Sequence, residues 1–317
     1  MAPKGWVDCH GHFYLPQSDE QRKQQIEGMR ESKFMVPMDW NWTPDDSLAY
    51  MDKAGVQMQM LSYIPLDLEK LKQANNYSAE LVRKHPTRFG QFAALPTDDP
   101  EAALAEIDRA RSELVADGFG VSAVYKGVFL GDERNEPVFK KLNELGAVVH
   151  VHPNAYAGPQ QGRPSPLIEV AFETCRVAVD MLYRGVFKRY PDIKFILGHC
   201  GGALPVLSGR LALLGTETWV PNPENLTKDE IKQQLSRLYV DTAATAETGL
   251  QPALKMVGAD HVVYGADCGV PCSTSDTMET NRHSLLNVAK EQGLDGNRFG
   301  TNAWDLFPSA AARVEKQ

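Results

Sequence analysis

The sequence predicts an α/β protein of the (β/α)8 class, a TIM barrel in which parallel strands close into a ring inside a layer of helices. Three observations support this prediction. Eight short runs rich in Val, Ile, Tyr and Phe alternate with segments of helical apolar spacing. The runs are almost continuously apolar, as expected for parallel strands covered on both faces. No Gly/Ser linker or block of charge divides the chain, so we expect one domain over residues 1–317.

The eight apolar runs define the predicted strands in chain order. They are residues 6–10, 56–63, 90–95, 119–125, 147–152, 194–199, 237–242 and 261–266. Two helices between them are clear from the sequence. PEAALAEIDRARSELVAD has apolar residues at helical spacing and Pro100 near its start. PLIEVAFETCRVAVDMLYRGVFKRYP ends before Pro191, as a helix does before a proline.

Two segments are longer than a barrel loop requires. Residues 13–44 follow the first strand and carry Trp40 and Trp42, and residues 200–236 follow the sixth strand and carry PNPENLTKDE. Insertions of this length usually form lids or interfaces. We therefore expect both insertions to serve the functional site or a subunit contact.

Composition restricts the function classes. The 317 residues include 33 basic and 41 acidic ones, and the net charge of −8 argues against a nucleic-acid surface. No apolar stretch approaches the ~20 residues of a membrane span. The start, MAPKGWVDCHGH, lacks the features of a signal peptide. Five cysteines without a CxxC pair indicate reduced thiols, so we expect a cytoplasmic protein without nucleic-acid or membrane partners.

Histidines and one aspartate stand at the ends of predicted strands. His10 and His12 end the first strand, His152 ends the fifth, His199 ends the sixth, and Asp267 follows the eighth. Residues two apart on a strand share a face, so both imidazoles of HGH can point into the barrel. The carboxyl ends of barrel strands meet at one mouth. Because imidazole and carboxylate suit a borderline divalent metal, we predict a mononuclear metal centre there.

Other candidates are weaker. His150 shares a strand face with the histidine two residues later but lies one layer deeper, so we expect it to pack or to contact a ligand residue. His85, His261 and His283 have positions typical of structural or exposed histidines. Lys126 follows the fourth strand, where some metal barrels use a modified lysine to bridge two metals. We interpret it as a lysine of the barrel rim and therefore predict one metal ion.

Motifs over nearly the whole chain carry a family resemblance. They are DCHGHF, WTPDDSLAYMDKAGV, KHPTRFGQFAALP, VVHVHP, GVFKRYPDIKFILGHCGGALPVLSGR, GADHVVYGAD and GTNAWDLFP. With these motifs the chain resembles the amidohydrolase superfamily of metal-dependent hydrolase-like barrels, and within it the amino-carboxymuconate-semialdehyde decarboxylase family. NEPVFKKLNELGAVVHVHP and HCGGALPVLSGRLALL are most similar to proteins of the 6-methylsalicylate decarboxylase type.

The resemblance implies residue roles and a substrate. The implied ligands of one divalent ion, with Zn²⁺ favoured and Mn²⁺ as the alternative, are His10, His12, His152 and Asp267. His199 matches an acid/base or partner residue beside the metal. Arg210 matches an arginine that reaches the active site of a neighbouring subunit and holds a substrate carboxylate, which implies a homodimer. The implied substrate is a small aromatic carboxylic acid, 6-methylsalicylate or a related hydroxybenzoate.

The implied reaction is loss of CO₂ without oxidation. Asp267 would protonate the ring carbon, and His199 would tune or relay that proton. Phe13, directly after HGH, belongs to the expected substrate site. Trp40 and Trp42 could stack on the ring and exclude water, although simple packing within the insertion explains either tryptophan equally well.

Two departures from the family pattern concern the pocket. Relatives usually have an aromatic residue and then proline after the aspartate of the eighth strand, whereas this chain has Cys268 and Gly269 in GADCGVPC. We therefore expect an altered pocket floor. Some relatives bind a second carboxylate with an arginine of a DPExR segment, and TPDDSLAYMD lacks it. This difference favours a monocarboxylate substrate.

The same residues leave other functions open. The ligand set would also generate metal-bound hydroxide for a hydrolase of a lactone, ester or amide, which is the principal alternative. A hydratase of an unsaturated diacid is a third chemistry. A binding protein without catalysis is disfavoured because the complete set of ligating and acid/base residues is retained.

Overall fold

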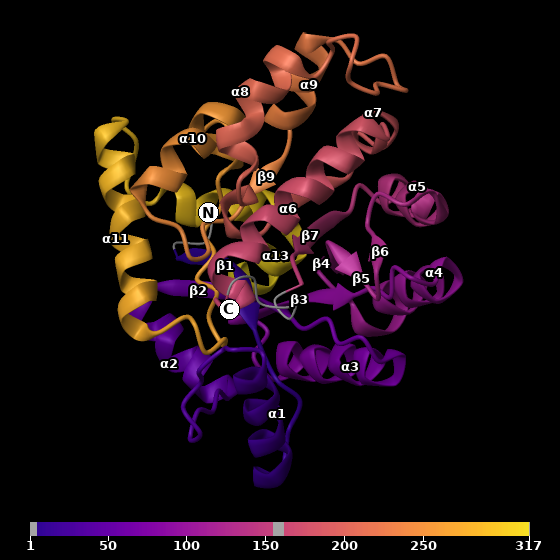
Figure 1. Cartoon of the computed structure of the whole chain (residues 1–317). Coiled ribbons are helices and arrows are strands. Elements are labelled where there is room, and N and C mark those ends of the chain that lie inside the picture. The colour runs from indigo at the N-terminus through magenta and orange to yellow at the C-terminus, as the bar shows by residue number, and fades with distance from the viewer. Residues whose placement is uncertain (1–4, 155–161, 317) are drawn as a thin grey trace.

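A computed structural model of the chain describes residues 5–154 and 162–316 (Figure 1). Residues 1–4, 155–161 and 317 of the predicted domain lie outside this description. The described residues form a parallel sheet in the order β1-β2-β3-β4-β7-β8-β9. Its strands are β1 (Trp6–His12), β2 (Val56–Ser62), β3 (Phe89–Ala94), β4 (Gly118–Ser122), β7 (Val148–His152), β8 (Lys194–Leu197) and β9 (Tyr239–Val240). A short antiparallel pair, β5 (Val124–Tyr125) and β6 (Val128–Phe129), follows β4.

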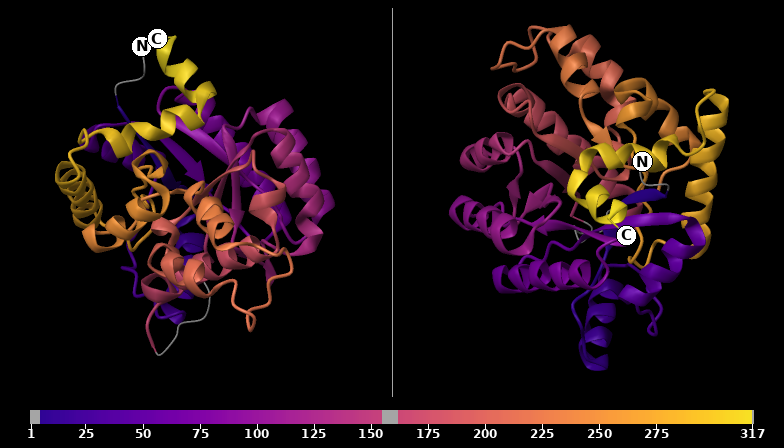
Figure 2. Two further views of the ribbon diagram at one scale, coloured as in Figure 1. Left: turned by 90° about the horizontal axis from the view of Figure 1, so that it is seen from above. Right: turned by 180° about the vertical axis from the view of Figure 1, so that it is seen from behind.

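Helices cover the sheet, most of them around its outer face, whereas the last, Pro308–Glu315, lies within that ring in Figure 1 and shares a buried cluster with Phe92 through Ala310 (Figures 1 and 2). They are α1 (Asp19–Glu31), α2 (Pro44–Ala54), α3 (Leu68–Lys84), α4 (Pro100–Arg109), α5 (Glu136–Glu144), α6 (Ser165–Tyr183), α7 (Val186–Arg189), α8 (Leu204–Leu214), α9 (Lys228–Ser236), α10 (Glu247–Val257), α11 (Ser275–Glu291), α12 (Arg298–Thr301) and α13 (Pro308–Glu315). None of the helices in the described ranges has both the length and the apolar character needed to cross a membrane. The strand–helix alternation confirms the predicted (β/α)8 class.

The eighth predicted strand, 261–266, is not a regular strand. Single parallel bridges join Val240 to Val262 and Gly11 to Cys268, so this segment still lies between β9 and β1. The amide of Ala266 donates to the Asp8 carboxylate, at 2.9 Å. The prediction of a regular strand is wrong because this amide bonds to a side chain instead of continuing a backbone ladder.

The predicted insertions differ from each other in structure. Residues 13–44 contain α1, which begins at a capping box made by Ser18 and Gln21, and they lead into α2. Residues 200–236 are not one long loop, because they contain α8 and α9, whose N-cap is Thr227. Part of this segment is therefore a helical crossover that follows β8.

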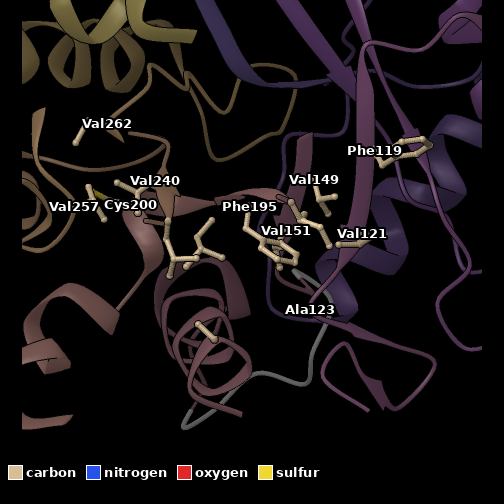
Figure 3. Packing of buried hydrophobic residues seen from close by; sticks show 14 of the residues in the cluster. Phe119, Val121, Ala123, Val149, Val151, Phe195, Cys200, Val240, Val257 and Val262 are labelled. Atoms are coloured by element: carbon tan, nitrogen blue, oxygen red, sulfur yellow. The ribbon is translucent and has the colours of Figure 1, made fainter. Parts of the chain in front are cut away.

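Alternation along β7 separates the core from the site. Val149 and Val151 point outward, into the apolar layer that β7 shares with Phe119 of β4 and Phe195 of β8 (Figure 3). His150 and His152 point to the opposite face, into the barrel. The strand therefore directs both imidazoles toward the barrel axis by the same pattern that builds the core.

Phe92 packs beneath the histidines in the interior of the barrel. Its buried ring stacks on His150, with centroids 5.3 Å apart, and meets Phe307 edge-on. We expect Phe92→Ala to lower the free energy of unfolding by about 3–5 kcal/mol, because it removes a buried ring and leaves a cavity. Denaturant unfolding would measure this loss. The half-exposed Phe129 is the matched control, and Phe129→Ala should change stability by about 0.5 kcal/mol or less.

Candidate metal centre

Five side chains from distant parts of the chain meet at the carboxyl end of the sheet. Nε2 of His10 and Nε2 of His12 lie 3.4 Å and 3.2 Å from Oδ1 of Asp267. Nε2 of His199 lies 3.8 Å from the other carboxylate oxygen, Oδ2. The ring of His152 has its centroid 5.0 Å from those of both His10 and His12. Separate strand ends thus place imidazole and carboxylate groups around one point.

His199 and Asp267 are presented by turns. The strand predicted over 194–199 ends at Leu197, and His199 lies in the 3-10 turn that follows. Both His199 and Asp267 have positive φ angles, 54° and 56°. Such angles are uncommon for residues other than glycine and often mark functional sites. These turns direct the two side chains toward each other across the barrel mouth.

Asp241, which the sequence analysis missed, orients the innermost histidine. It is fully buried after β9, and its Oδ2 lies 2.7 Å from Nδ1 of His10 and 2.9 Å from Nε2 of His150. Its Oδ1 accepts a hydrogen bond from the backbone N–H of His199 at 2.9 Å. Burial opposes ionisation of Asp241, but its interactions with His10 and His150, which include a hydrogen bond with each ring, lower its pKa well below the ordinary value. The Asp241 carboxylate therefore fixes the positions of the His10 ring, the His150 ring and the backbone of His199 relative to one another.

Asp8 is a second buried carboxylate that the sequence analysis did not select. It accepts hydrogen bonds from the backbone N–H of His10 and of Ala266 and from Nε2 of Gln59. Burial raises its pKa to about 6, against the opposing effect of these donors. A charged residue inside an otherwise apolar strand was the available signal. Asp8 ties β1 to the segment that bears Asp267.

The donor atoms fit a divalent metal ion. Nε2 of His10 and Nε2 of His12 are buried without a hydrogen-bond partner. Burial lowers the pKa of His10 to about 4, so its ring is neutral and can present a lone pair from Nε2 while Nδ1–H bonds to Asp241. A carboxylate that orients a ligating histidine in this way is a common arrangement in metal sites. Unpaired buried nitrogens beside a carboxylate are the donors a metal requires.

Among the described residues, two groups of side chains are close enough to share an ion. The first, with ligand atoms within 4.8 Å of one another, is His10, His152, His199 and Asp267. The second is His10, His150 and Asp241. In the second group both histidines already contact Oδ2 of Asp241, so we interpret it as the support of the first. His12 joins the first group through its 3.2 Å contact with Asp267.

The support role of Asp241 gives a testable prediction. Asp241→Asn should weaken metal binding by about 10–100-fold, because the amide cannot supply the negative acceptor for both histidines. Calorimetric titration of the metal-free protein with Zn²⁺ or Mn²⁺ would measure the change. Asp229→Asn, at an exposed carboxylate of α9, is the control and should bind metal like the parent protein. Equal affinities in the two variants would contradict this role.

A cavity of about 650 Å³ opens beside these side chains. His152, His199 and Asp267 lie in its wall, and apolar residues from several elements form much of the remainder. Ser273, also in the wall, donates a hydrogen bond to Oδ2 of Asp267 at 3.1 Å. The arrangement can hold a small molecule against the carboxylate and the histidines.

The predicted substrate residues lie elsewhere in the described structure. Phe13 is buried against Tyr63, and Trp40 packs edge-on against Tyr14, with ring centroids 5.3 Å apart. Trp42 donates to Oγ of Ser47 and lines a separate cavity of about 260 Å³. Neither Phe13 nor the tryptophans are among the described residues that line the larger cavity. Their aromatic side chains pack against the chain itself, and the wall on this side is Tyr14 and Phe34.

Arg210 and Lys126 also lie away from the cluster. Arg210 is exposed on α8 and is not among the described residues that line the cavity of its own chain. Lys126 is at the rim, with Nζ 3.0 Å from Oδ2 of Asp98.

The segment GADCGVPC contributes to the cavity wall mainly through residues that follow Cys268 and Gly269. Cys268 is fully buried and is not among the described lining residues, whereas Val270, Cys272 and Ser273 are. Gly269 has φ 93°, and a Cβ there would lie 2.5 Å from the carbonyl oxygen of His12. Glycine is therefore needed at this close approach.

Comparison with known proteins places this geometry in a family. The family profile described as Amidohydrolase matches residues 7–306. Decarboxylase macB of Penicillium terrestre is 33% identical over 336 aligned residues, covering 95% of this chain and 94% of that protein. The 6-methylsalicylic acid decarboxylase of Penicillium expansum is 30% identical over 276 residues, covering 82% and 84%.

A solved structure shares the fold. It is the dihydroxybenzoic acid decarboxylase of Polaromonas sp. JS666 with bound manganese and the inhibitor 2-nitroresorcinol, at a TM-score of 0.78 and 24% identity. The match covers 96% of this chain and 97% of that one. Because the family profile spans nearly the whole barrel, including His10, His152 and Asp267, the chain belongs to the amidohydrolase family.

Proposed function

We propose that the chain is a metal-dependent, non-oxidative decarboxylase of a small aromatic carboxylic acid, with 6-methylsalicylate or a related hydroxybenzoate as substrate. The observation that carries the proposal is the cluster of His10, His152, His199 and Asp267, the last three of which lie in the wall of a cavity of about 650 Å³. It is supported by relatives that are named decarboxylases, one of them for 6-methylsalicylic acid, at 30–33% identity.

The proposed cofactor is one divalent metal ion. Its proposed ligands are His10, His12, His152 and Asp267. Three imidazoles and one carboxylate suit Zn²⁺, our first choice, and also Mn²⁺, which the Polaromonas decarboxylase binds. When bound, the ion would orient the carboxylate and phenolate of the substrate and stabilise their negative charge.

Asp267 is the proposed proton donor. Direct loss of CO₂ from a hydroxybenzoate would leave an unstable aryl carbanion. If Asp267 first protonates the ring carbon that bears the carboxylate, the carbon–carbon bond can break with its electron pair returning to the ring, which becomes aromatic again. Oδ1 of Asp267 faces His10 and His12, whereas Oδ2 faces His199 and Ser273, so Oδ2 is the oxygen available for proton transfer.

His199 is the proposed group that exchanges this proton with Asp267. Burial disfavours its charged form, but the hydrogen bond and charge of Asp267 raise its pKa overall. The raised pKa favours the protonated ring, which is the form that could return a proton to Oδ2 after each turnover. Ser273 holds the same oxygen from the other side.

A substrate assay tests the proposal. The protein loaded with Zn²⁺ or Mn²⁺ should convert 6-methylsalicylate to CO₂ and 3-methylphenol in equal amounts. Cleavage of lactones, esters or amides without turnover of any hydroxybenzoate would favour the alternative, a hydrolase that uses metal-bound hydroxide.

We also propose a homodimer in which Arg210 holds the substrate carboxylate in the neighbouring subunit. Support comes from the surface around it, because exposed Val206, Leu207 and Leu213 flank Arg210 on α8. Contiguous exposed apolar side chains commonly mark interfaces. We further propose one domain over residues 1–317 and a cytoplasmic location, the latter supported by five free cysteines.

Arg210→Ala should lower kcat/KM through a higher KM, because a charge-assisted bidentate contact with the carboxylate is lost. Mixed dimers test whether the arginine acts across subunits. Arg210→Ala and Asp267→Asn chains, each impaired alone, should regain activity when co-expressed, since one site of the mixed dimer has both residues. No recovery in verified mixed dimers would contradict the proposed contact.

A further inference from the structure

The cavity beside the metal cluster has an extended apolar wall. Val170 of α6 and Met278 of α11 line it and are only 5% and 3% exposed, and Leu167 at the start of α6 lines it at 66% exposure. Phe34 and Val270 continue the wall from two other segments. Aliphatic and aromatic surface from four parts of the chain therefore faces one space.

Charged groups are scarce in the same wall. Within residues 5–154 and 162–316, no arginine or lysine lines the cavity, and Asp276 is the one carboxylate there besides Asp267. A second anionic group on a substrate would have no positive partner in this wall, and an unpaired charge is costly to remove from water. The wall is suited to an uncharged, apolar substituent.

The volume exceeds what a methyl-substituted ring needs. Cavities that bury drug-sized ligands measure about 300–1,000 Å³, and this one measures about 650 Å³. A benzoate with one hydroxyl and one methyl group is much smaller than such a ligand. With its carboxylate at the metal cluster, it would leave much of the apolar wall in contact with water.

We propose that the enzyme prefers an aromatic acid carrying an unbranched alkyl chain longer than methyl, bound along the wall formed by Leu167, Val170 and Met278. The inference rests on the proposed decarboxylase function, since that function places the carboxylate at Asp267. The chain would extend away from the reacting carbon and would replace water over these side chains. Each buried CH₂ should improve kcat/KM by up to about fourfold, equivalent to about 0.8 kcal/mol.

Two measurements on the Mn²⁺-loaded enzyme test the inference. The first compares kcat/KM for 6-methyl-, 6-propyl- and 6-pentylsalicylate, and we expect it to rise along the series. The second measures the Kd of the matching 3-alkyl-2-nitrophenols, in which a nitro group replaces the carboxylate so that no turnover is possible. We expect Kd to fall as the chain lengthens.

The outcomes separate this inference from the proposed function. Turnover of 6-methylsalicylate with no gain in rate or binding for longer chains would overturn the inference and leave the function intact. Tighter binding of longer nitrophenols without decarboxylation of any acid would support the apolar wall and overturn the function. Neither turnover nor chain-dependent binding would overturn both.

Adjacent residues of α6 provide a matched pair of variants. Leu167 lines the cavity, whereas its neighbour Ile168, 38% exposed, is not among the described lining residues. Leu167→Asn should flatten the dependence of Kd on chain length, and Ile168→Asn should preserve it. If both variants flatten it equally, the effect comes from the helix rather than from the wall, and the inference is wrong.

Discussion

Asp267→Asn is expected to reduce kcat for decarboxylation by about 10²–10⁴-fold, the usual contribution of a positioned general acid. Asparagine keeps the size of the side chain but cannot deliver the proton. Oδ2, beside His199 and Ser273, is the position that changes chemically. Steady-state rates with 6-methylsalicylate, measured at saturating metal, would show the loss.

Asp267 is also a proposed ligand, so metal content must be measured on the same samples. A variant that retains its ion and loses turnover would support the role of Asp267 as acid. Asp276→Asn is the matched control, because Asp276 lines the same cavity but belongs to neither group of possible metal ligands among the described residues. It should retain most of its kcat. Full activity in Asp267→Asn would exclude Asp267 as the proton donor.

Removal of the metal should lower the decarboxylation rate on the order of 10³-fold. Charge stabilisation by a bound ion is worth several kcal/mol, and each 1.4 kcal/mol corresponds to about tenfold in rate. Dialysis against a chelator followed by the assay would measure this loss. Mn²⁺ or Zn²⁺ should restore activity. Mg²⁺ should not, since it prefers oxygen ligands in octahedral geometry.

The metal prediction has a second readout in stability. An ion that binds only the folded chain raises the unfolding temperature, so the metal-free protein should unfold at a lower temperature. His12→Asn should lower both metal content and this temperature difference. His283→Asn, at an exposed histidine of α11, should leave both unchanged. A metal-free protein that retains the full rate would refute the proposed cofactor.

Much of the barrel could be predicted because the alternation of residues along a strand in the sequence matches the alternation of outward and inward side chains in the folded barrel. The run predicted over 147–152 forms β7 (Val148–His152), where the outer residues meet helices and the inner ones meet the site. The run predicted over 237–242 forms a strand only at Tyr239–Val240. The next residue, Asp241, still donates its backbone N–H to the carbonyl of Leu197 at the end of β8, while its carboxylate contacts His10.

The wall of the cavity could be predicted less well, again for a physical reason. Trp40 and Trp42 were selected as large aromatics in a long insertion, yet aromatic side chains bury apolar surface equally well against their own chain. Tyr14 lies at the cavity with Trp40 behind it. Met278, on a helix far along the sequence, had no local feature that set it apart from an ordinary core residue.

The sequence by itself determined the barrel class and the candidate metal ligands, because apolar runs and the polar residues that end them are local patterns. Only the tertiary structure decided how these residues are supported. Asp241 is 231 positions from His10, yet their side chains lie 2.7 Å apart. Such a pairing depends on how the strands close into a ring, and no spacing along the chain encodes it. The shape of the cavity has the same origin, since its wall combines side chains from elements that meet only after the barrel has closed.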